Sequence, residues 1–322
     1  MMKKILRLIG VMLLVVLLAA FGYRVVHNQP DRSVDELSAR WAPSPSQFID
    51  INGLQVHLRD EGPRDDPAPI ILLHGTSASL HTWDGWTQAL VEQQHRVIRF
   101  DLPGFGLTGP AVDNDYRIES YAQTVMNVLD SLNIEQATLA GNSLGGYIAW
   151  ATAVLYPNRI KNLVLVDPSG YPYESESLPL AFKIAKTPIL NQLMHGFLPR
   201  SLVASSVRNV YGDPSLVSEE LIDRYFELTT RAGNRDALAE RFKQTRPGAM
   251  VKRMAEIKVP TLILWGQKDR LIPAHLAEHF HQAINNSQVH IFPLLGHVPQ
   301  EEDPQQSVGV LSKFLEEHRT SQ

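Results

Sequence analysis

Short, mostly apolar runs alternate with amphipathic segments along most of the chain. Runs of this kind suit strands that are buried on both faces of a sheet. They occupy residues 69–73, 96–100, 136–140, 162–167, 260–266 and 289–292. Segments with helical periodicity lie between them, at 118–132, 145–156, 274–284 and 304–318. The alternation predicts an α/β fold, with a mostly parallel sheet flanked by helices.

Two regions depart from this alternation. Residues 47–51 and 54–59 alternate apolar and polar positions about an Asn-Gly pair, which predicts a β-hairpin. From 171 to 256 no strand pattern occurs, and helical segments such as 218–231 and 235–245 are separated by prolines. We therefore expect a helical cap inserted between two strands of the sheet.

The N-terminus has the pattern of an export signal. Lys3, Lys4 and Arg7 precede an uncharged apolar run over residues 8–23. Counted over 5–26, with the flanking arginines turned outward, the apolar stretch is 22 residues long and can span a bilayer. The basic flank keeps the N-terminal end in the cytoplasm, so the rest of the chain faces the periplasm or the exterior. A small-x-small pattern near the end of the run leaves a cleaved signal peptide, and hence a secreted protein, as the alternative.

A polar, proline-containing stretch follows and predicts a linker that holds the domain away from the membrane. The expected organisation has five parts. They are a signal anchor or signal peptide at 1–24, the linker at 25–46, a first core part at 47–170, the cap at 171–256 and a second core part at 257–322.

Composition limits the chemistry. The 322 residues contain no cysteine, which excludes disulfides, thiolate catalysis and cysteine-ligated metals. The formal net charge is −4 and no basic run stands out beyond the N-terminus, so nucleic acid is not an expected partner. The expected partners are a small molecule and, through the N-terminal segment, a membrane. Oligomeric state stays open.

One turn carries the strongest chemical signal. The predicted strand at 136–140 leads through Gly141-Asn142-Ser143-Leu144-Gly145-Gly146 into a predicted helix. A strand that turns into a helix so sharply strains one residue and lifts its side chain clear of the sheet. Here that side chain is the hydroxyl of Ser143, in a Gly-x-Ser-x-Gly nucleophile elbow.

A serine nucleophile needs a base, and the base needs an orienting group. In an open α/β sheet such groups gather at the carboxyl ends of the strands. Asp269 and His297 both lie just beyond predicted strands, downstream of Ser143, in the chain order Ser, Asp, His. Asp167 also ends a strand and is the rival acid.

Five motifs together resemble the α/β-hydrolase superfamily, from about residue 47 to the C-terminus. They are His74-Gly75, Asp101-Leu102-Pro103-Gly104, the 141–146 elbow, Trp265-Gly266-Gln267-Lys268-Asp269 and Gly296-His297. The resemblance implies that Ser143 attacks a substrate carbonyl, His297 takes and returns the proton, and Asp269 orients His297. It also implies an oxyanion hole built from the backbone N–H groups of Leu144 and Thr76. No cofactor or metal is expected.

The serine at the elbow argues against epoxide or halide chemistry, for which relatives carry an aspartate. We expect a serine hydrolase that cleaves a carboxylic ester, or a related acyl compound, of small to medium apolar character. The Gly-Asn-Ser-x-Gly-Gly form is also similar to that of meta-cleavage-product hydrolases, so a C–C bond hydrolase with the same triad is the alternative. A catalytically weak ligand-binding module on the same fold is a further one.

Several other residues invite a functional interpretation. His275 and His279 fit the H-x-x-E-H zinc-protease pattern, but no third ligand is evident. Trp83 and Trp86 are expected to be core aromatics, and His57, His81, His95 and His195 to be surface or packing residues. Large side chains of the cap either line an apolar acyl pocket or bury the cap's own helices. The residues in question are Tyr171, Phe182, Phe197, Leu198 and Tyr211.

Overall fold

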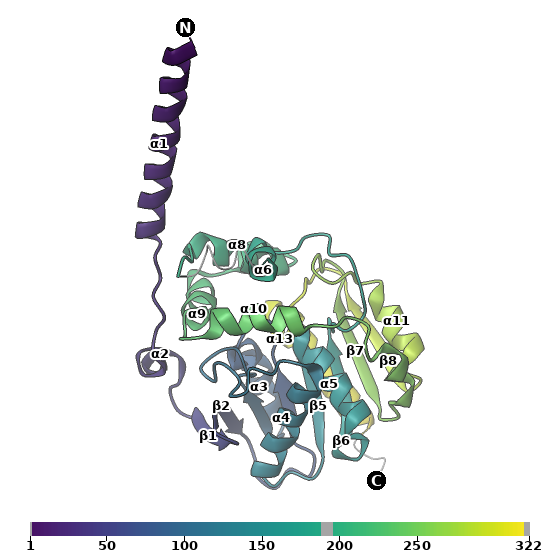
Figure 1. Ribbon diagram of the computed structural model, residues 1–322. Coiled ribbons are helices and arrows are strands. Elements are labelled where there is room, and N and C mark those ends of the chain that lie inside the picture. The colour runs from purple at the N-terminus through teal and green to yellow at the C-terminus, as the bar shows by residue number, and fades with distance from the viewer. Residues whose placement is uncertain (1, 188–195, 319–322) are drawn as a thin grey trace.

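An eight-stranded sheet forms the centre of the protein, and a long helix stands apart from it (Figure 1). The structure is a computed structural model that describes residues 2–187 and 196–318; His195 lies outside the described residues. The strand order is β1-β2-β4-β3-β5-β6-β7-β8. β1, β2 and β4 pair antiparallel, and the pairs from β4 through β3 to β8 are parallel. The prediction of a mostly parallel α/β sheet is confirmed.

Each strand forms where the apolar pattern predicts it. The predicted hairpin is also present, as the antiparallel pair β1 and β2. The strands are β1 (Gln47–Ile51), β2 (Leu54–Glu61), β3 (Ile70–Leu73), β4 (Val97–Phe100), β5 (Ala137–Asn142), β6 (Ile160–Val166), β7 (Thr261–Gly266) and β8 (Ser287–Phe292). Every residue of β3, β4, β5 and β7 is buried, as both faces of a covered sheet require.

Helices cover the two faces of the sheet separately. One apolar cluster joins the sheet to α4, α5 and α11, and a second joins it to α3 and α13. Trp83 and Trp86 are fully buried in the second cluster, as expected from the sequence. These helices are α3 (Asp84–Glu92), α4 (Ile118–Ser131), α5 (Leu144–Leu155), α11 (Leu276–Ala283), α12 (Pro299–Glu302) and α13 (Pro304–Glu317), with short 3-10 turns at Leu80–Trp83 and Pro157–Arg159.

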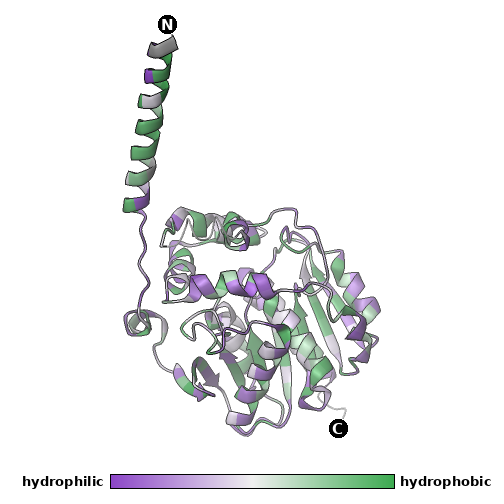
Figure 2. Ribbon diagram, in the orientation of Figure 1, coloured by the Kyte–Doolittle hydropathy of each residue, from purple (hydrophilic) through white to green (hydrophobic). Residues whose placement is uncertain are grey.

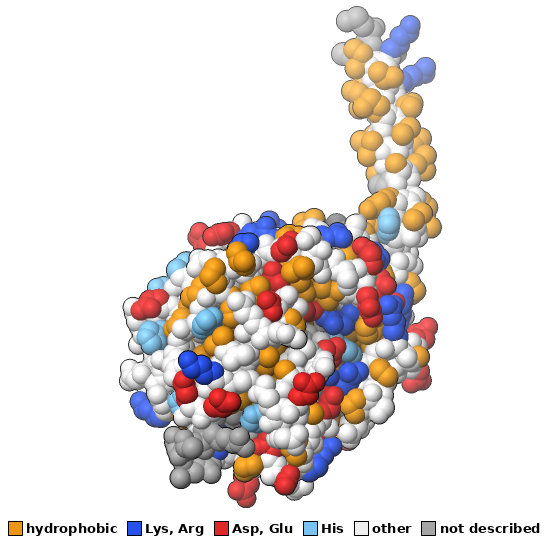
Figure 3. All heavy atoms as spheres, turned by 180° about the vertical axis from the view of Figure 1, so that it is seen from behind, with side chains coloured by type: hydrophobic (Ala, Val, Ile, Leu, Met, Phe, Trp, Pro, Cys, Tyr) orange, Lys and Arg blue, Asp and Glu red, His pale blue; other side chains and the backbone are white. Residues whose placement is uncertain are grey.

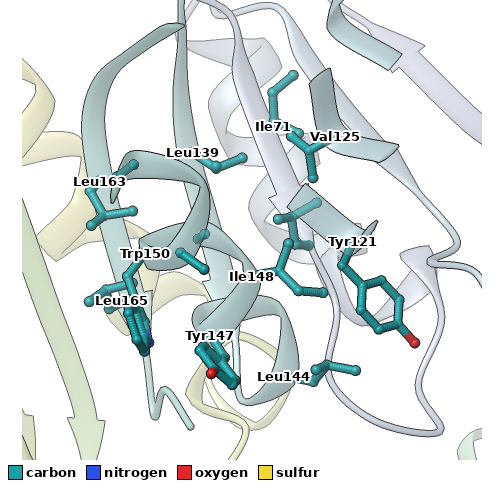
Figure 4. Close-up of a cluster of buried hydrophobic side chains, with 14 of the residues drawn as sticks. Ile71, Tyr121, Val125, Leu139, Leu144, Tyr147, Ile148, Trp150, Leu163 and Leu165 are labelled. Atoms are coloured by element: carbon teal, nitrogen blue, oxygen red, sulfur yellow. The ribbon is translucent and has the colours of Figure 1, made fainter. Parts of the chain in front are cut away.

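Helix α5 is buried almost all round, because it lies between the sheet and α4. Its residues Leu144, Ile148 and Trp150 pack against side chains from β3, β5 and β6 (Figure 4). Truncating one such buried side chain typically costs about 2–5 kcal/mol. This packing anchors the turn that precedes the helix.

Between β6 and β7 the described residues form helices and no strand. These are α6 (Leu180–Lys186), α8 (Arg200–Val210), α9 (Glu219–Thr229) and α10 (Asn234–Gln244), with 3-10 turns at Pro214–Leu216 and Val251–Glu256. They lie over one end of the sheet (Figure 1). Part of this insertion has a small apolar core of its own, which includes Leu198, Tyr211 and Phe226 and extends to Val298.

The N-terminal helix α1 (Met2–Val26) projects away from the rest of the protein (Figures 1 and 2). Within the part of the chain that the structure describes, it is the one helix long and apolar enough to cross a membrane, over Lys4–Val26. Figure 3 shows apolar side chains along most of its length on the face in view. Its last turn contacts the insertion, because the rings of Tyr23 and Phe197 lie 5.7 Å apart. Just beyond the helix, the Gln29 N–H donates to the Gly196 carbonyl over 2.7 Å.

Residues 25–46, expected to be a linker, contain a helix that the apolar pattern did not predict. α2 (Val34–Trp41) begins with a capping box in which Ser33 and Glu36 satisfy each other's backbone N–H groups. Trp41 packs with Leu107 and Leu228, and its indole N–H donates to Glu227 over 2.7 Å. The segment is therefore docked on both the core and the insertion, and the Ser-x-x-Glu pattern was its sequence signal.

Candidate active site

Ser143 sits in a backbone conformation that side chains rarely adopt, with φ 54° and ψ −113°. Such strain costs on the order of 1–3 kcal/mol and persists only where the surroundings impose it. Here close packing imposes it: a Cβ on Gly141 would lie 2.1 Å from the Gly145 oxygen, and one on Gly145 would lie 2.1 Å from the Leu73 oxygen. Only glycine at both positions lets α5 start this close to β3 and β5, which is the geometry the sequence predicted for the elbow.

Hydrogen bonds fix the strained residue from both sides. The Ser143 N–H donates to the Val166 carbonyl over 3.0 Å. The Ser143 carbonyl accepts from the backbone N–H groups of Tyr147 and Ser169, both at 3.0 Å. The main chain of Ser143 is thus held by β6, by its own helix and by the loop after β6, and its side chain is left to point away from the sheet.

His297 and Asp269 meet as the sequence predicted. His297 Nδ1 lies 2.6 Å from Asp269 Oδ2, and both residues are buried, with 4% of each exposed. The other oxygen of Asp269 accepts from the backbone N–H groups of Leu271 and Ile272 at 2.8 and 2.9 Å. With both oxygens engaged, the Asp269 side chain is fixed in place and can orient the imidazole through Nδ1.

The loop that carries His297 is tied down by two further side chains. Asn142 donates from Nδ2 to the carbonyls of His297 and Val166 at 2.9 and 3.1 Å. Glu302 accepts from the N–H groups of Gly296 and Gly212 at 2.8 and 3.0 Å. Asn142 therefore connects the elbow to the histidine loop, and sequence reasoning had noted it only as part of the motif.

Asp167, the rival acid, lies beside this pair without bonding to the histidine. Its Oδ1 accepts from the Gly266 N–H over 2.9 Å, and its Oδ2 has no hydrogen-bond partner among the described residues. Ligand atoms of Asp167, Asp269 and His297 all lie within 4.8 Å of one another. Burial, and then the charge of Asp269, raise the pKa of Asp167 well above its ordinary value. Asp269, and not Asp167, is therefore the acidic side chain that reaches the histidine.

A pocket between the sheet and the insertion brings the chemistry together. Ser143, His297 and Thr76 all line it. Most of its other walls are apolar and come from α6, α8 and α10; they include Ile184, Ala185, Leu202, Val207 and Leu238. Of the cap residues singled out in the sequence, Phe182, Phe197 and Leu198 line this pocket. Tyr171 instead lines a neighbouring pocket, and Tyr211 is buried in the insertion's own core.

Two backbone N–H groups close to Ser143 have no acceptor among the described residues. Leu144 N–H is the first of α5 and Thr76 N–H belongs to the loop after β3. Neither donates a hydrogen bond to another backbone or side-chain group in the described parts of the chain. Both groups are available to a substrate oxygen.

Sequence reasoning missed the cations that line this pocket, which among the described residues are Lys186, Arg235 and Arg241. Basic residues on predicted helices usually face solvent, so nothing in the sequence marked Arg241, which is only 8% exposed. The zinc-protease pattern, by contrast, finds no support. His275 and His279 are exposed and stack edge to face with ring centres 5.8 Å apart. Neither belongs to a group that can hold a metal ion within the described residues.

A second Ser-His-Asp arrangement lies elsewhere in the core. His57 Nδ1 is 2.7 Å from Asp101 Oδ2, and His57 Nε2 is 2.9 Å from Ser46 Oγ. Asp101 also accepts from the N–H groups of Leu80 and Leu107, both at 2.8 Å. His57, expected to be a packing or surface residue, is fully buried. None of these residues lines the pocket that holds Ser143.

The fold and this site define a class of protein. The family model described as alpha/beta hydrolase fold matches residues 68–304, and the chain belongs to that family. A 2-hydroxy-6-oxo-2,4-heptadienoate hydrolase from Pseudomonas putida is 29% identical over 279 residues, which cover 84% of this chain and 95% of that protein.

Two solved structures extend the comparison. A putative lipase from Acinetobacter baumannii superposes with a TM-score of 0.75 at 25% identity, covering 91% of this chain and 98% of that one. A membrane phospholipase A, described as a bacterial virulence factor, has a TM-score of 0.71 at 22% identity and covers 100% of both chains. At that identity the second match concerns the fold alone.

Proposed function

We propose that this protein is a serine hydrolase in which Ser143 is the nucleophile, His297 the general base and acid, and Asp269 the orienting acid. The observation that carries the proposal is that the strained Ser143 and His297, which the buried Asp269 contacts, line one pocket. Convergence of a nucleophile, an oriented base and free backbone donors on one cavity is what acyl transfer requires.

Each of these groups has its own step in the proposed reaction. Ser143 Oγ attacks the carbonyl carbon of the substrate as its proton passes to His297 Nε2. The oxygen that becomes negative is received by the N–H groups of Leu144 and Thr76, and each such donor is worth roughly 100- to 1000-fold in rate. The leaving group departs with the proton from His297. Water, deprotonated by His297, then attacks the acyl-enzyme and releases the acid and Ser143.

Within this scheme we favour hydrolysis of a C–C bond next to a ketone. The relative that acts on 2-hydroxy-6-oxo-2,4-heptadienoate aligns over most of both chains, and this chain has the Gly-Asn-Ser-x-Gly-Gly elbow. A carbon leaving group departs only if its electron pair is delocalised, as it is in a conjugated keto acid. These observations support the C–C reaction, the alternative from sequence, better than they support ester hydrolysis.

Ester hydrolysis is the second candidate, and a different observation favours it. The walls contributed by α6, α8 and α10 are mainly apolar, which suits an acyl chain. The similarity to a putative lipase over 91% of the chain points the same way.

A substrate comparison on the purified full chain separates the two. Turnover of 2-hydroxy-6-oxo-2,4-heptadienoate, followed by loss of its conjugated chromophore, should exceed that of nitrophenyl esters of any chain length by about tenfold or more in kcat/KM. Turnover of the esters alone would move the assignment to an esterase. If neither class is turned over and a fluorophosphonate fails to label Ser143, the protein is a binding module.

The same proposal tethers the enzyme to a membrane through α1, with the catalytic domain on the periplasmic or exterior side. The apolar helix, the basic residues Lys4 and Arg7 at its start and the docked α2 support this placement. The full-length protein should sediment with membranes, and removal of residues 1–25 should give an active soluble domain. Mature protein beginning near residue 23 would instead establish a cleaved signal peptide.

A further inference from the structure

Arg241 is a buried cation for which the described part of the protein provides no counter-ion. It is 8% exposed, and no carboxylate of the described residues forms an ion pair with it. Its Nη2 donates to Thr76 Oγ1 over 2.9 Å and its Nη1 donates to Thr245 Oγ1 over 3.2 Å, both neutral hydroxyls. Its Nε has no partner among the described residues. A buried charge without a partner is costly, and so its retention calls for an explanation.

A second cation lies close to it. The Lys186 ammonium is 5.0 Å from the centre of the Phe242 ring, and the Arg241 guanidinium carbon is 4.9 Å from the same centre. Burial, and then the charge of Arg241, lower the pKa of Lys186, as expected for two neighbouring like charges. No ion pair joins Lys186 to a described carboxylate either. Both cations line the pocket that contains Ser143 and His297.

The position of Arg241 relates these charges to the reaction. The residue it contacts, Thr76, also supplies one of the two backbone donors proposed for the oxyanion. The guanidinium therefore lies beside the place where the substrate carbonyl is held, on the wall formed by α10. Its unused N–H donors form a charged patch in a pocket whose walls are mainly apolar, where an anion gains most from charge-assisted hydrogen bonds.

We infer that Arg241, assisted by Lys186, is the binding site for a carboxylate carried by the substrate away from its scissile bond. This inference rests on the proposed function and adds to it a substrate class: acyl compounds that carry a carboxylate in addition to the reacting carbonyl. Both reactions considered above accommodate such a substrate, as a keto acid or as a monoester of a dicarboxylic acid.

The same pocket contains a matched control. Arg235 lies on the same helix and also lines the pocket, but it forms an ion pair with Asp31. Its charge is therefore already compensated. If pocket cations in general attract anions, Arg235 and Arg241 should behave alike; if the uncompensated cation is the receptor, only Arg241 should matter.

Binding to an inactive full-length variant tests the site without relying on catalysis. We would measure, by calorimetry on Ser143→Ala, the affinities of monomethyl and dimethyl esters of a dicarboxylic acid series from succinate to sebacate. The anionic monoester of the best-fitting length should bind roughly 10- to 100-fold more tightly than its neutral dimethyl partner, the range of charged hydrogen bonds. Adding Arg241→Met should abolish this preference, Arg241→Lys should retain part of it, and Arg235→Met should leave it in place.

Turnover supplies the second test. In the wild-type background, Arg241→Met should lower kcat/KM for an anionic monoester while sparing a neutral ester of equal length, and Lys186→Met should do the same to a smaller extent. Equal losses for both esters would show that Arg241 only positions Thr76, and would overturn the inference. Equal affinities of Ser143→Ala for the anionic and neutral ligands, or no measurable binding of any anion, would overturn it as well. If anions bind as described but no substrate is turned over, the proposed reaction fails while the anion site stands.

Discussion

The described part of this domain contains two Ser-His-Asp sets, and their histidine–aspartate contacts are nearly equal in length. In each, histidine Nδ1 contacts a buried aspartate, at 2.6 Å for His297–Asp269 and 2.7 Å for His57–Asp101. In the second, Nε2 also has a serine hydroxyl 2.9 Å away, on Ser46. The histidine–carboxylate distance alone therefore does not distinguish the two arrangements.

Their surroundings separate them. His57 is fully buried within the protein, and Ser46 Oγ also accepts a hydrogen bond from the Arg59 guanidinium over 2.9 Å. Asp101 also accepts hydrogen bonds from the backbone N–H groups of Leu80 and Leu107. The arrangement therefore joins three segments: strand β2, the loop after β4 and the 3-10 turn at Leu80–Trp83. Ser143, in contrast, is strained, lines a pocket and lies near unpaired backbone donors. We therefore expect catalysis at Ser143, where access, strain and free donors coincide, and not at every histidine–aspartate contact.

Removing each serine gives the largest expected contrast. Ser143→Ala should reduce turnover on the order of a million-fold, as in other triads, because the nucleophile itself is lost. Ser46→Ala should leave turnover close to wild type. Circular dichroism would verify that both variants are folded. Comparable losses of turnover in both variants would contradict the difference in role between Ser143 and Ser46.

The two aspartates near His297 should also differ in how much their replacement lowers turnover. Asp269→Asn preserves shape but favours the wrong tautomer, and should lower kcat roughly ten-thousand-fold with little change in melting temperature. Asp167→Asn should cost far less, because Asp167 contacts the Gly266 N–H and not the histidine. Should purified, folded variants show the reverse order, the acid role would pass to Asp167.

Asp101→Asn should act on stability in place of turnover. The substitution leaves His57 and two buried N–H groups with one good acceptor, which should lower the free energy of unfolding by about 3 kcal/mol. Urea unfolding would measure the loss, and turnover per folded molecule should stay near wild type. A selective loss of kcat with unchanged stability would contradict a structural role for the His57–Asp101 pair.

The smallest expected effect is a pH-dependent difference in melting temperature between Asp167→Asn and the wild type. The raised pKa of Asp167 means that the folded protein binds more protons than the unfolded chain once the pH exceeds the ordinary aspartate value of about 3.9. Stability from this group is therefore lost as pH rises, until the folded pKa is passed. Asp167→Asn lacks this penalty, so its melting temperature relative to wild type should increase between pH 4 and pH 8. A difference that stays constant with pH would show that Asp167 ionises normally.

Much of this could be predicted from the sequence. Buried strands were found because both faces are apolar, and the elbow because only glycine at 141 and 145 permits the close approach that strains Ser143. The position of His297 and Asp269 after strand ends was also predictable, since parallel strands deliver their carboxyl ends to one edge.

Other features depended on contacts between distant segments. The docking of α2, the Ser46–His57–Asp101 arrangement and the uncompensated charge of Arg241 join residues from different elements. No local pattern encodes whether a histidine is sealed or accessible, or whether an arginine finds a counter-ion. Those properties follow from the way distant segments pack together in the folded chain.

Covalent labelling with a fluorophosphonate, followed by peptide mapping, tests the central claim most directly. The account predicts a single adduct on Ser143 in the wild-type protein, none on Ser46, and a large fall in labelling rate in His297→Gln but not in His57→Gln. An adduct on Ser46, or undiminished labelling of Ser143 without His297, would contradict the assignment of the nucleophile and its base.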